Sequence, residues 1–310
     1  MNRDDKIYVA GHRGLVGSAI CRALEGGGFT NVVVRTHAEL DLTDRSAVDA
    51  FFERERPAHC ILAAARVGGI VANDTYPAEF IRDNLAIELN VIDAAHRYGV
   101  DKLLLLGSSC IYPRDCPQPI REEYLLTGPL ETTNSAYAVA KIAGIEMCRA
   151  YRRQYGDRFI AVMPTNLYGP GDNYDLKSSH VLPALIRKMV EAKAATAPTV
   201  TIWGTGKPRR EFLHADDLAD ACLFLLERYD GEEIVNIGVG RDITIGELAR
   251  MVADAVGYTG ELVFDTTKPD GTPQKLLDVS RLTGLGWQAR ISLREGIART
   301  VAEYLEHGGG

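Results

Sequence analysis

The feature that most constrains the fold of this 310-residue chain is a regular alternation of short apolar runs with longer amphipathic segments. Apolar runs at 7–10, 31–35, 59–65 and 102–109 have the length of buried strands, and the segments 15–25, 45–56 and 78–99 between them have helical spacing. Strands that alternate with helices indicate βαβ units, in which helices cover both faces of a parallel sheet. We therefore predict an α/β fold, a Rossmann-type doubly wound parallel sheet.

A smaller unit is predicted after this sheet, because a helix at 135–155 leads into a strand that ends in the Pro/Gly-rich stretch "PTNLYGPG". Beyond it the pattern is less regular, with helices at 178–192, 215–228, 244–257 and 292–307 and strands at 200–204 and 233–240. We expect residues 1–165, with a return segment near 212–240, to form the first domain. Residues 166–310 should form mainly a C-terminal α/β substrate-binding domain.

The composition is that of a globular protein that does not bind polyanions. Hydrophobic residues make up 46% of the chain, charged residues 25%, and the formal net charge is -7. Binders of nucleic acids or anionic membranes carry an excess of basic residues, so we expect neither as a partner. The N-terminus has no signal-peptide pattern and no apolar run approaches ~18 residues, so we expect a cytoplasmic protein.

The cysteines do not form a metal-binding pattern. None is part of a C-x-x-C motif or pairs with histidine at zinc-like spacing, so we expect no metal site. In a reducing cytosol they should be free thiols, most of them small core residues. Cys110 is different, because it follows two serines in "GSSCIYP" at the end of an apolar strand. The six are Cys21, Cys60, Cys110, Cys116, Cys148 and Cys222.

A glycine-rich turn, "GHRGLVG", lies between the first strand and the first helix and contains Gly11, Gly14 and Gly17. Glycines let the backbone approach a pyrophosphate at a helix N-terminus, where unpaired N–H groups favour an anion. The spacing G-x-x-G-x-x-G is typical of short-chain dehydrogenases, and the absence of G-K-[ST] argues against a nucleoside-triphosphate site. We predict that the turn binds a dinucleotide.

The end of the second strand favours NADP over NAD. An NAD enzyme places an acidic residue there to bind the ribose 2′-hydroxyl. This chain instead has Arg35 and His37 at that place, and Arg13 inside the glycine turn. Basic side chains at both places would bind a 2′-phosphate.

Tyr137 and Lys141 form a Y-x-x-x-K pattern, which places both on one face of a helix. A free tyrosine has a pKa of ~10, and a neighbouring ammonium would lower it and favour the phenolate. Ser108 or Ser109, at the end of a central strand, could then bind a substrate carbonyl oxygen. Together, serine, tyrosine and lysine can polarise a ketone for hydride transfer.

These motifs resemble the extended short-chain dehydrogenase/reductase family, and more narrowly its GDP-L-fucose synthases, over nearly the whole chain. The resemblance rests on "AGHRGLVGSAI", "LGSSCIYP", "NSAYAVAKIAGIEMC", "MPTNLYGPGDNY", "SSHVLPALIRK", "RREFLHADDLADA" and "KPDGTPQKLLDVSRL". It implies an NADP(H)-dependent homodimer that epimerises GDP-4-keto-6-deoxy-D-mannose at carbons 3 and 5 and then reduces carbon 4.

The resemblance also implies residue roles. Ser108, Tyr137 and Lys141 match the reductase triad, Cys110 matches the epimerase base, and His180 matches its acid partner. The implied cofactor-binding residues are Gly11, His12, Arg13, Gly14, Leu15, Val16, Gly17, Arg35, His37, Leu106, Gly107, Ser109, Pro164, Asn166 and Leu167. The implied substrate-binding residues are Lys188, Trp203, Arg210, Asp270 and Lys275.

Two positions depart from some relatives, which have arginine in place of His37 and of Lys188. Two other functions stay open. One is an NAD-dependent nucleotide-sugar epimerase or dehydratase that recycles its cofactor, and the other is a regulator that binds NADP without turnover. His214, Asp216 and Asp217 could suggest a hydrolase triad, but no G-x-S-x-G motif exists and we predict helix capping and domain docking.

Overall fold

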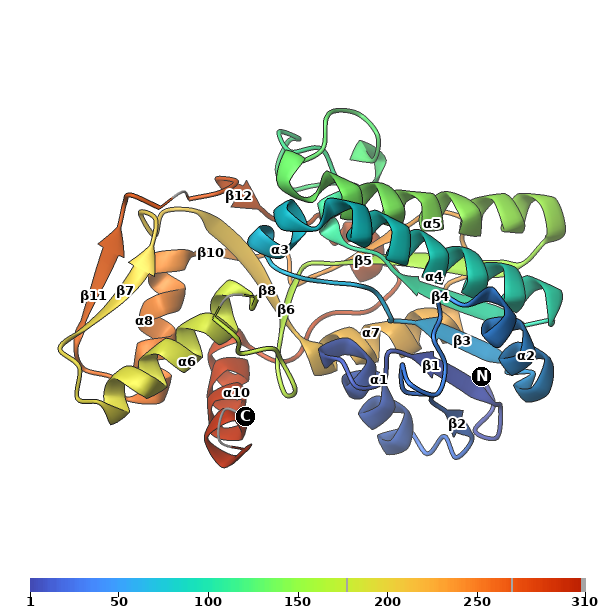
Figure 1. Cartoon of the computed structure of the whole chain (residues 1–310), viewed down its shortest axis with the longest axis horizontal. Coiled ribbons are helices and arrows are strands. Elements are labelled where there is room, and N and C mark those ends of the chain that lie inside the picture. Colours follow the sequence, from blue (N-terminus) through green and yellow to red (C-terminus); the bar gives the residue numbers. More distant parts are fainter. Residues whose placement is uncertain (177, 269, 308–310) are drawn as a thin grey trace.

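The computed structural model describes residues 1–176, 178–268 and 270–307. Its largest sheet has six parallel strands in the order β2-β1-β3-β4-β5-β9 (Figure 1). The strands are β1 (Ile7–Ala10), β2 (Val32–Val33), β3 (His59–Leu62), β4 (Lys102–Leu106), β5 (Arg158–Pro164) and β9 (Val235–Ile237). The predicted doubly wound parallel sheet is confirmed, although β2 is shorter than the run 31–35.

Alternating side chains of the strands form two cores, one on each face of the sheet. Leu103 and Leu105 of β4 pack in one core, whereas Leu104 and Leu106 pack in the other. Figure 1 shows α4 and α5 on one side of the sheet and α1 and α7 on the other. Their bounds are α1 (Leu15–Gly26), α2 (Arg45–Glu55), α4 (Pro77–Arg97), α5 (Ser135–Tyr155) and α7 (Ala215–Arg228). Burial on both faces explains why the strands read as continuous apolar runs.

The chain order creates a switch point beside β1, which lies between β2 and β3. Successive connections leave β1 in opposite directions, so a crevice forms at the carboxyl ends of the strands. The glycine turn follows β1 and the "GSSCIYP" segment follows β4, so both lie at that edge. This arrangement brings the predicted cofactor and catalytic segments to one end of the sheet.

A second unit contains the remaining strands and a third core. β8 (Arg209–His214) pairs with β10 (Asp242–Thr244), β12 (Gln274–Lys275) and β6 (Asn166–Tyr168), while β7 (Thr199–Trp203) pairs with β11 (Glu261–Asp265). The helices are α6 (Val181–Ala194), α8 (Ile245–Val256) and α10 (Leu293–His307), at the left in Figure 1. They pack around buried residues such as Ile186, Leu248 and Ile297.

Several elements of this second unit were not predicted. Most important is β8, which passes close to the main sheet and carries the predicted substrate residue Arg210. Its sequence, "RREFLH", has no clean apolar alternation, because its first half is polar and its second half is buried. The short helices α3 (Ile70–Thr75) and α9 (Ser280–Gly284) were also missed. In the described residues, no helix has the length and apolar character needed to cross a membrane.

Candidate active site

The segment after β4 forms a 3-10 turn, η1 (Ser109–Ile111), that presents both the serine and the cysteine. Ser108 Oγ caps this turn by accepting a hydrogen bond from the Cys110 backbone N–H at 3.2 Å. Ser109 is buried beneath the turn, whereas Ser108 and Cys110 are half-buried. The capped turn therefore holds the Ser108 hydroxyl and the Cys110 thiol at adjacent positions on the sheet edge.

Helix α5 places Tyr137 and Lys141 beside this turn, as the four-residue spacing predicted. The Lys141 ammonium donates a hydrogen bond to the Leu106 carbonyl at 3.0 Å and lies 5.9 Å from the centre of the Tyr137 ring. The Phe80 and Tyr137 rings form a T-shaped pair, with 6.5 Å between ring centres. These contacts anchor the helix to the end of β4.

The electrostatics of Tyr137 differ from the expectation. The surrounding protein removes the phenol from water, and this burial, with contributions from Cys110 and Glu88, raises its pKa; a hydrogen bond with Ser108 acts in the opposite direction but is weaker. The sequence also did not predict that Lys141 forms an ion pair, in which its ammonium lies 3.0 Å from the Glu88 carboxylate. Tyr137 is therefore a protonated phenol at neutral pH.

A second cluster surrounds Cys110 from the other unit. Lys275 of β12 points its ammonium at the Cys110 sulfur, with 3.7 Å between Nζ and Sγ. His180, an exposed residue, is the N-cap of α6; partial desolvation by the surrounding protein, and then the nearby charge of Lys275, lower the pKa of its imidazole. The structure thus brings a thiol, an ammonium and an imidazole together from three separate segments.

The glycine turn has the geometry that a pyrophosphate requires. Gly11 has a φ of 88°, and a Cβ at Gly17 would collide with the Gly11 carbonyl, so helix α1 approaches the turn closely. Gly14 is the N-cap of α1 and no side chain caps that end, which leaves backbone N–H groups available for an anion. His12, Arg13, Leu15 and Val16 lie in this turn and in the first turn of the helix.

The basic residues expected at the 2′-phosphate are only partly available. Arg35 pairs with Glu55 at 2.8 Å and also donates to the Val34 carbonyl, whereas Arg13 and His37 are exposed. An acidic residue lies nearby, because Glu39 accepts hydrogen bonds from the N–H and hydroxyl of Thr36. These bonds, and more weakly the charges of Arg35 and Arg13, lower the pKa of Glu39. The sequence interpretation missed this carboxylate.

The other residues expected at the nicotinamide end follow neighbouring strands. Leu106 ends β4 and Gly107 follows it, and Pro164 ends the adjacent β5. Asn166 and Leu167 are in β6, and the Asn166 side chain donates to the Glu211 carbonyl at 2.8 Å. They therefore lie at the junction between the main sheet and β8.

The predicted substrate residues lie in two groups. Trp203 is 59% exposed, and the ammonium groups of Lys188 and Lys268 lie 5.7 and 5.6 Å from its ring centre. Arg210 is paired in register with Lys275, and its burial lowers the pKa of the guanidinium. Within the described ranges, no carboxylate forms an ion pair with Lys188 or Arg210, so both cations remain available for a ligand.

The carboxylate of Asp270, a predicted substrate residue, forms hydrogen bonds with another loop of the protein. Its carboxylate accepts hydrogen bonds from the Thr205 N–H at 2.6 Å and from the Thr205 hydroxyl at 2.8 Å. Thr205 follows Trp203 and the positive-φ Gly204. Asp270 thus fixes the loop that carries Trp203.

Two buried carboxylates were missed. Glu88 lies on the inner face of α4, below Phe80 and Asn84, where the helical pattern would put apolar residues; this break in the pattern was the signal. Glu211 accepts hydrogen bonds from the N–H groups of Val239, Gly240 and Leu277. Glu211 thereby ties β8 to two loops, one of which continues from Lys275.

The histidine–aspartate motif has the structural role that was predicted. The N-cap of α7 is His214, whose imidazole accepts a hydrogen bond from the Asp216 N–H. Asp216 forms an ion pair with Arg22 of α1, and Asp217 accepts from the N–H groups of 290 and 291. The motif docks α7 onto its neighbours.

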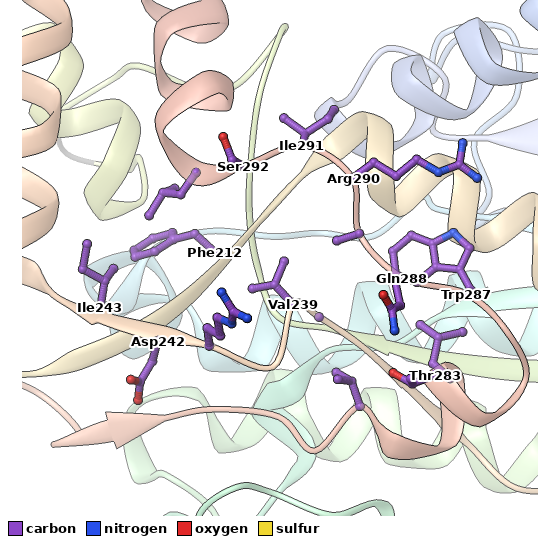
Figure 2. A pocket seen from close by; sticks show the side chains of 16 residues that line it. Phe212, Val239, Asp242, Ile243, Thr283, Trp287, Gln288, Arg290, Ile291 and Ser292 are labelled. Carbon is purple, nitrogen blue, oxygen red and sulfur yellow. The ribbon is translucent and has the colours of Figure 1, made fainter.

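A cavity of about 610 Å³ is lined by other residues (Figure 2). Phe212, Val239, Ile243 and Trp287 contribute to its wall, and no predicted site residue lines it. The candidate active site is therefore the cluster at the carboxyl edge of the sheet and not this cavity.

Comparisons with known proteins show which family the chain belongs to. The NAD dependent epimerase/dehydratase family matches residues 7–238. GDP-L-fucose synthase 1 of Arabidopsis thaliana is 60% identical over 306 residues, which are 99% of this chain and 95% of that protein. The structure of a GDP-6-OMe-4-keto-L-xylo-heptose reductase from C. jejuni matches with a TM-score of 0.94 and 38% identity over 99% of both chains.

A GDP-L-fucose synthetase from Naegleria fowleri, solved with NADP bound, matches with a TM-score of 0.91 and 32% identity over 99% of this chain and 96% of that one. These similarities cover the glycine turn, the Tyr137–Lys141 helix and the second unit alike. The chain therefore belongs to the NAD dependent epimerase/dehydratase family and, within it, to the GDP-L-fucose synthases.

Proposed function

We propose that this enzyme converts GDP-4-keto-6-deoxy-D-mannose to GDP-L-fucose with NADPH, by epimerisation at carbons 3 and 5 and reduction at carbon 4. The observation that carries the proposal is the contact between Cys110 and Lys275 beside the Ser108, Tyr137 and Lys141 group. An enzyme that only reduced the ketone would need Ser108, Tyr137 and Lys141 but not the Cys110–Lys275 contact. The family membership and the NADP-bound relative support the same reaction and cofactor.

The cofactor would lie along the carboxyl edge of the main sheet, with its pyrophosphate at the uncapped N-terminus of α1. Arg13 and Arg35 would bind the 2′-phosphate, with His37 at the rim. When bound, NADPH supplies the hydride for reduction. Leu106, Gly107, Ser109, Pro164, Asn166 and Leu167 would form the inner end of the cofactor site.

In the reduction, Ser108 and Tyr137 donate hydrogen bonds to the 4-keto oxygen, where negative charge develops. Tyr137 then transfers its proton to that oxygen, and the high pKa of the phenol keeps that proton in place until charge develops. Lys141 anchors α5 through the Leu106 carbonyl and so holds Tyr137 next to η1.

In the epimerisation, the Cys110 thiolate takes the proton from the carbon beside the ketone, and the electron pair moves to the keto oxygen as an enolate. The same Ser108 and Tyr137 donors stabilise that oxygen. His180 returns a proton to the opposite face of the carbon, which inverts it. The Lys275 ammonium lies 3.7 Å from the sulfur that takes this proton.

The substrate nucleotide would bind across the second unit. Trp203 offers an exposed ring for stacking on the guanine, and Lys188 and Arg210 are cations that suit its diphosphate. Asp270 shapes this site by holding the Thr205 loop. We assign cofactor binding to residues 1–165, with a return segment near 212–240. We assign substrate binding mainly to residues 166–310.

We also propose a cytoplasmic homodimer. The six cysteines are free thiols, which fits a reducing compartment. Leu85 and Leu89 of α4 and Val139 of α5 are 37%, 47% and 44% exposed, on two adjacent helices. A second copy could cover this apolar surface, and sedimentation of the intact protein would test that.

The deciding experiment incubates the enzyme with GDP-4-keto-6-deoxymannose and NADPH and follows cofactor oxidation together with deuterium uptake from solvent. Stoichiometric oxidation with deuterium at carbons 3 and 5 supports the proposal. Turnover without net oxidation would indicate a cofactor-recycling epimerase or dehydratase. Binding without turnover would indicate an NADP-binding regulator, and either result would overturn the proposed function.

A further inference from the structure

The catalytic lysine has an ionic partner on another helix. Glu88 of α4 is 1% exposed, and its carboxylate lies 3.0 Å from the Lys141 ammonium of α5. Both side chains are 2% exposed, so water does not screen the pair. Lys141 therefore acts on its surroundings as half of a buried ion pair and not as an isolated cation.

The packing of the two helices provides room for this carboxylate. Gly144 lies one turn after Lys141, and a Cβ there would be 2.5 Å from Glu88 Oε2. A Cβ would also crowd the Leu105 side chain at 3.0 Å. A glycine inside a long helix is less favourable than an alanine. The helix thus contains an unfavourable residue at the one place where the carboxylate needs space.

Stability alone does not explain the pair. Burial raises the pKa of Glu88, and Lys141 and the Gly144 N–H only partly offset this. Buried ion pairs are often no more stabilising than apolar side chains of similar volume. Lys141 also has the Leu106 carbonyl as a hydrogen-bond acceptor without Glu88.

The reaction supplies a reason. An ammonium beside a phenol favours the phenolate, whereas a reductase needs a phenol that still holds its proton. We propose that Glu88 is a positioning residue that balances the charge of Lys141 and thereby keeps Tyr137 in its proton-donating form. This inference rests on the proposed role of Tyr137 and assigns to Glu88 the task of suiting the site to reduction.

The other ionisable groups around this pair do not replace Glu88. Cys148 of α5 and Cys60 of β3 are buried near it, and burial raises the pKa of each thiol, so both are neutral. Cys110 faces Tyr137 from η1, with Lys275 and then His180 beyond it. The carboxylate that faces the Lys141 ammonium is therefore that of Glu88.

The test is the pH profile of single-turnover reduction, with a pre-epimerised 4-keto sugar as substrate so that Cys110 chemistry is not needed. In Glu88→Gln, Lys141 is unopposed, and we expect the loss of activity at high pH to begin about one pH unit lower than in the parent. Glu88→Asp keeps the charge and should restore the parent profile. Glu53→Gln, an exposed glutamate of α2, is the matched control and should change nothing.

Two further variants make every outcome decisive. If Glu88→Gln does not fold, Glu88→Gln/Lys141→Met removes both buried charges, and its alkaline limit should not fall below that of the parent. An unshifted profile in folded Glu88→Gln, or a lowered limit in the double variant, overturns the inference. Tyr137→Phe tests the proposed role of Tyr137 separately from that of Glu88. If this variant still reduces the ketone, Tyr137 is not the proton donor, whatever the result for the Glu88 variants.

Discussion

The Lys275 ammonium lies 3.7 Å from the Cys110 sulfur, although the two residues are 165 positions apart in the chain. One follows the central strand of the main sheet and the other is on β12 of the second unit. The contact therefore forms only when the two units are packed together. It places a positive charge at the thiol that epimerisation would use as a base.

Cys110→Ser should separate the two half-reactions. A serine hydroxyl is far less acidic than a thiol, so we expect deuterium uptake at carbons 3 and 5 to fall by at least ~100-fold. Reduction of a pre-epimerised ketone should continue, because Ser108 and Tyr137 are unchanged. Deuterium uptake by the serine variant at the parent rate would refute the assignment of Cys110 as base.

Lys275→Met should slow epimerisation without abolishing reduction. Loss of the ammonium removes a positive charge that lies 3.7 Å from the sulfur, and we expect about a tenfold lower rate of deuterium uptake at neutral pH. Lys275→Arg, which keeps the charge, serves as the control. Equal loss in both variants at every pH would mean that Lys275 contributes packing and not charge.

Glu39→Gln should strengthen NADPH binding. The Glu39 carboxylate lies in the field of Arg13 and Arg35, where the 2′-phosphate is proposed to bind, and its negative charge opposes that phosphate. Because the site is exposed, we expect only about a threefold lower Kd for NADPH, measured by fluorescence titration, and no change for NADH. Glu25→Gln, at the far end of α1, is the control; an equal gain for NADH would place the 2′-phosphate elsewhere.

Asp172→Asn should stabilise the protein at alkaline pH. Burial, opposed by a hydrogen bond from the Asn173 N–H and assisted by Glu303, raises the pKa of Asp172 to about 7. A raised carboxyl pKa means that the folded state retains a proton that the unfolded state loses. The contribution of Asp172 to the free energy of unfolding therefore declines as pH rises from about 4 through 7.

Asparagine keeps the acceptor and removes the charge, so Asp172→Asn should raise the free energy of unfolding at pH 8 by about 1–2 kcal/mol. The gain should shrink toward pH 4. Denaturant titrations at both values test this, with the exposed Asp74→Asn as the reference. A gain that is the same at both pH values would contradict the titration of Asp172.

Sequence patterns predicted the features that depend on neighbouring residues. Short apolar runs that alternate with segments of helical spacing identified the parallel sheet, and β1 and α5 have the predicted bounds. The glycine turn and the Tyr137–Lys141 pair are each short motifs whose residues are close together along the chain. Local geometry is therefore enough to predict them. Cys110, too, was recognisable as a polar break at the end of an apolar strand.

Only the tertiary structure determined how these groups are charged and paired. The sequence suggested that Lys141 lowers the pKa of Tyr137, but Glu88, on a different helix, pairs with that lysine, and burial raises the pKa instead. In the same way, the approach of Lys275 to Cys110 depends on β12 pairing with β8, a strand with no readable pattern. Ionisation depends on distance and burial in three dimensions, and no local period of the chain encodes either.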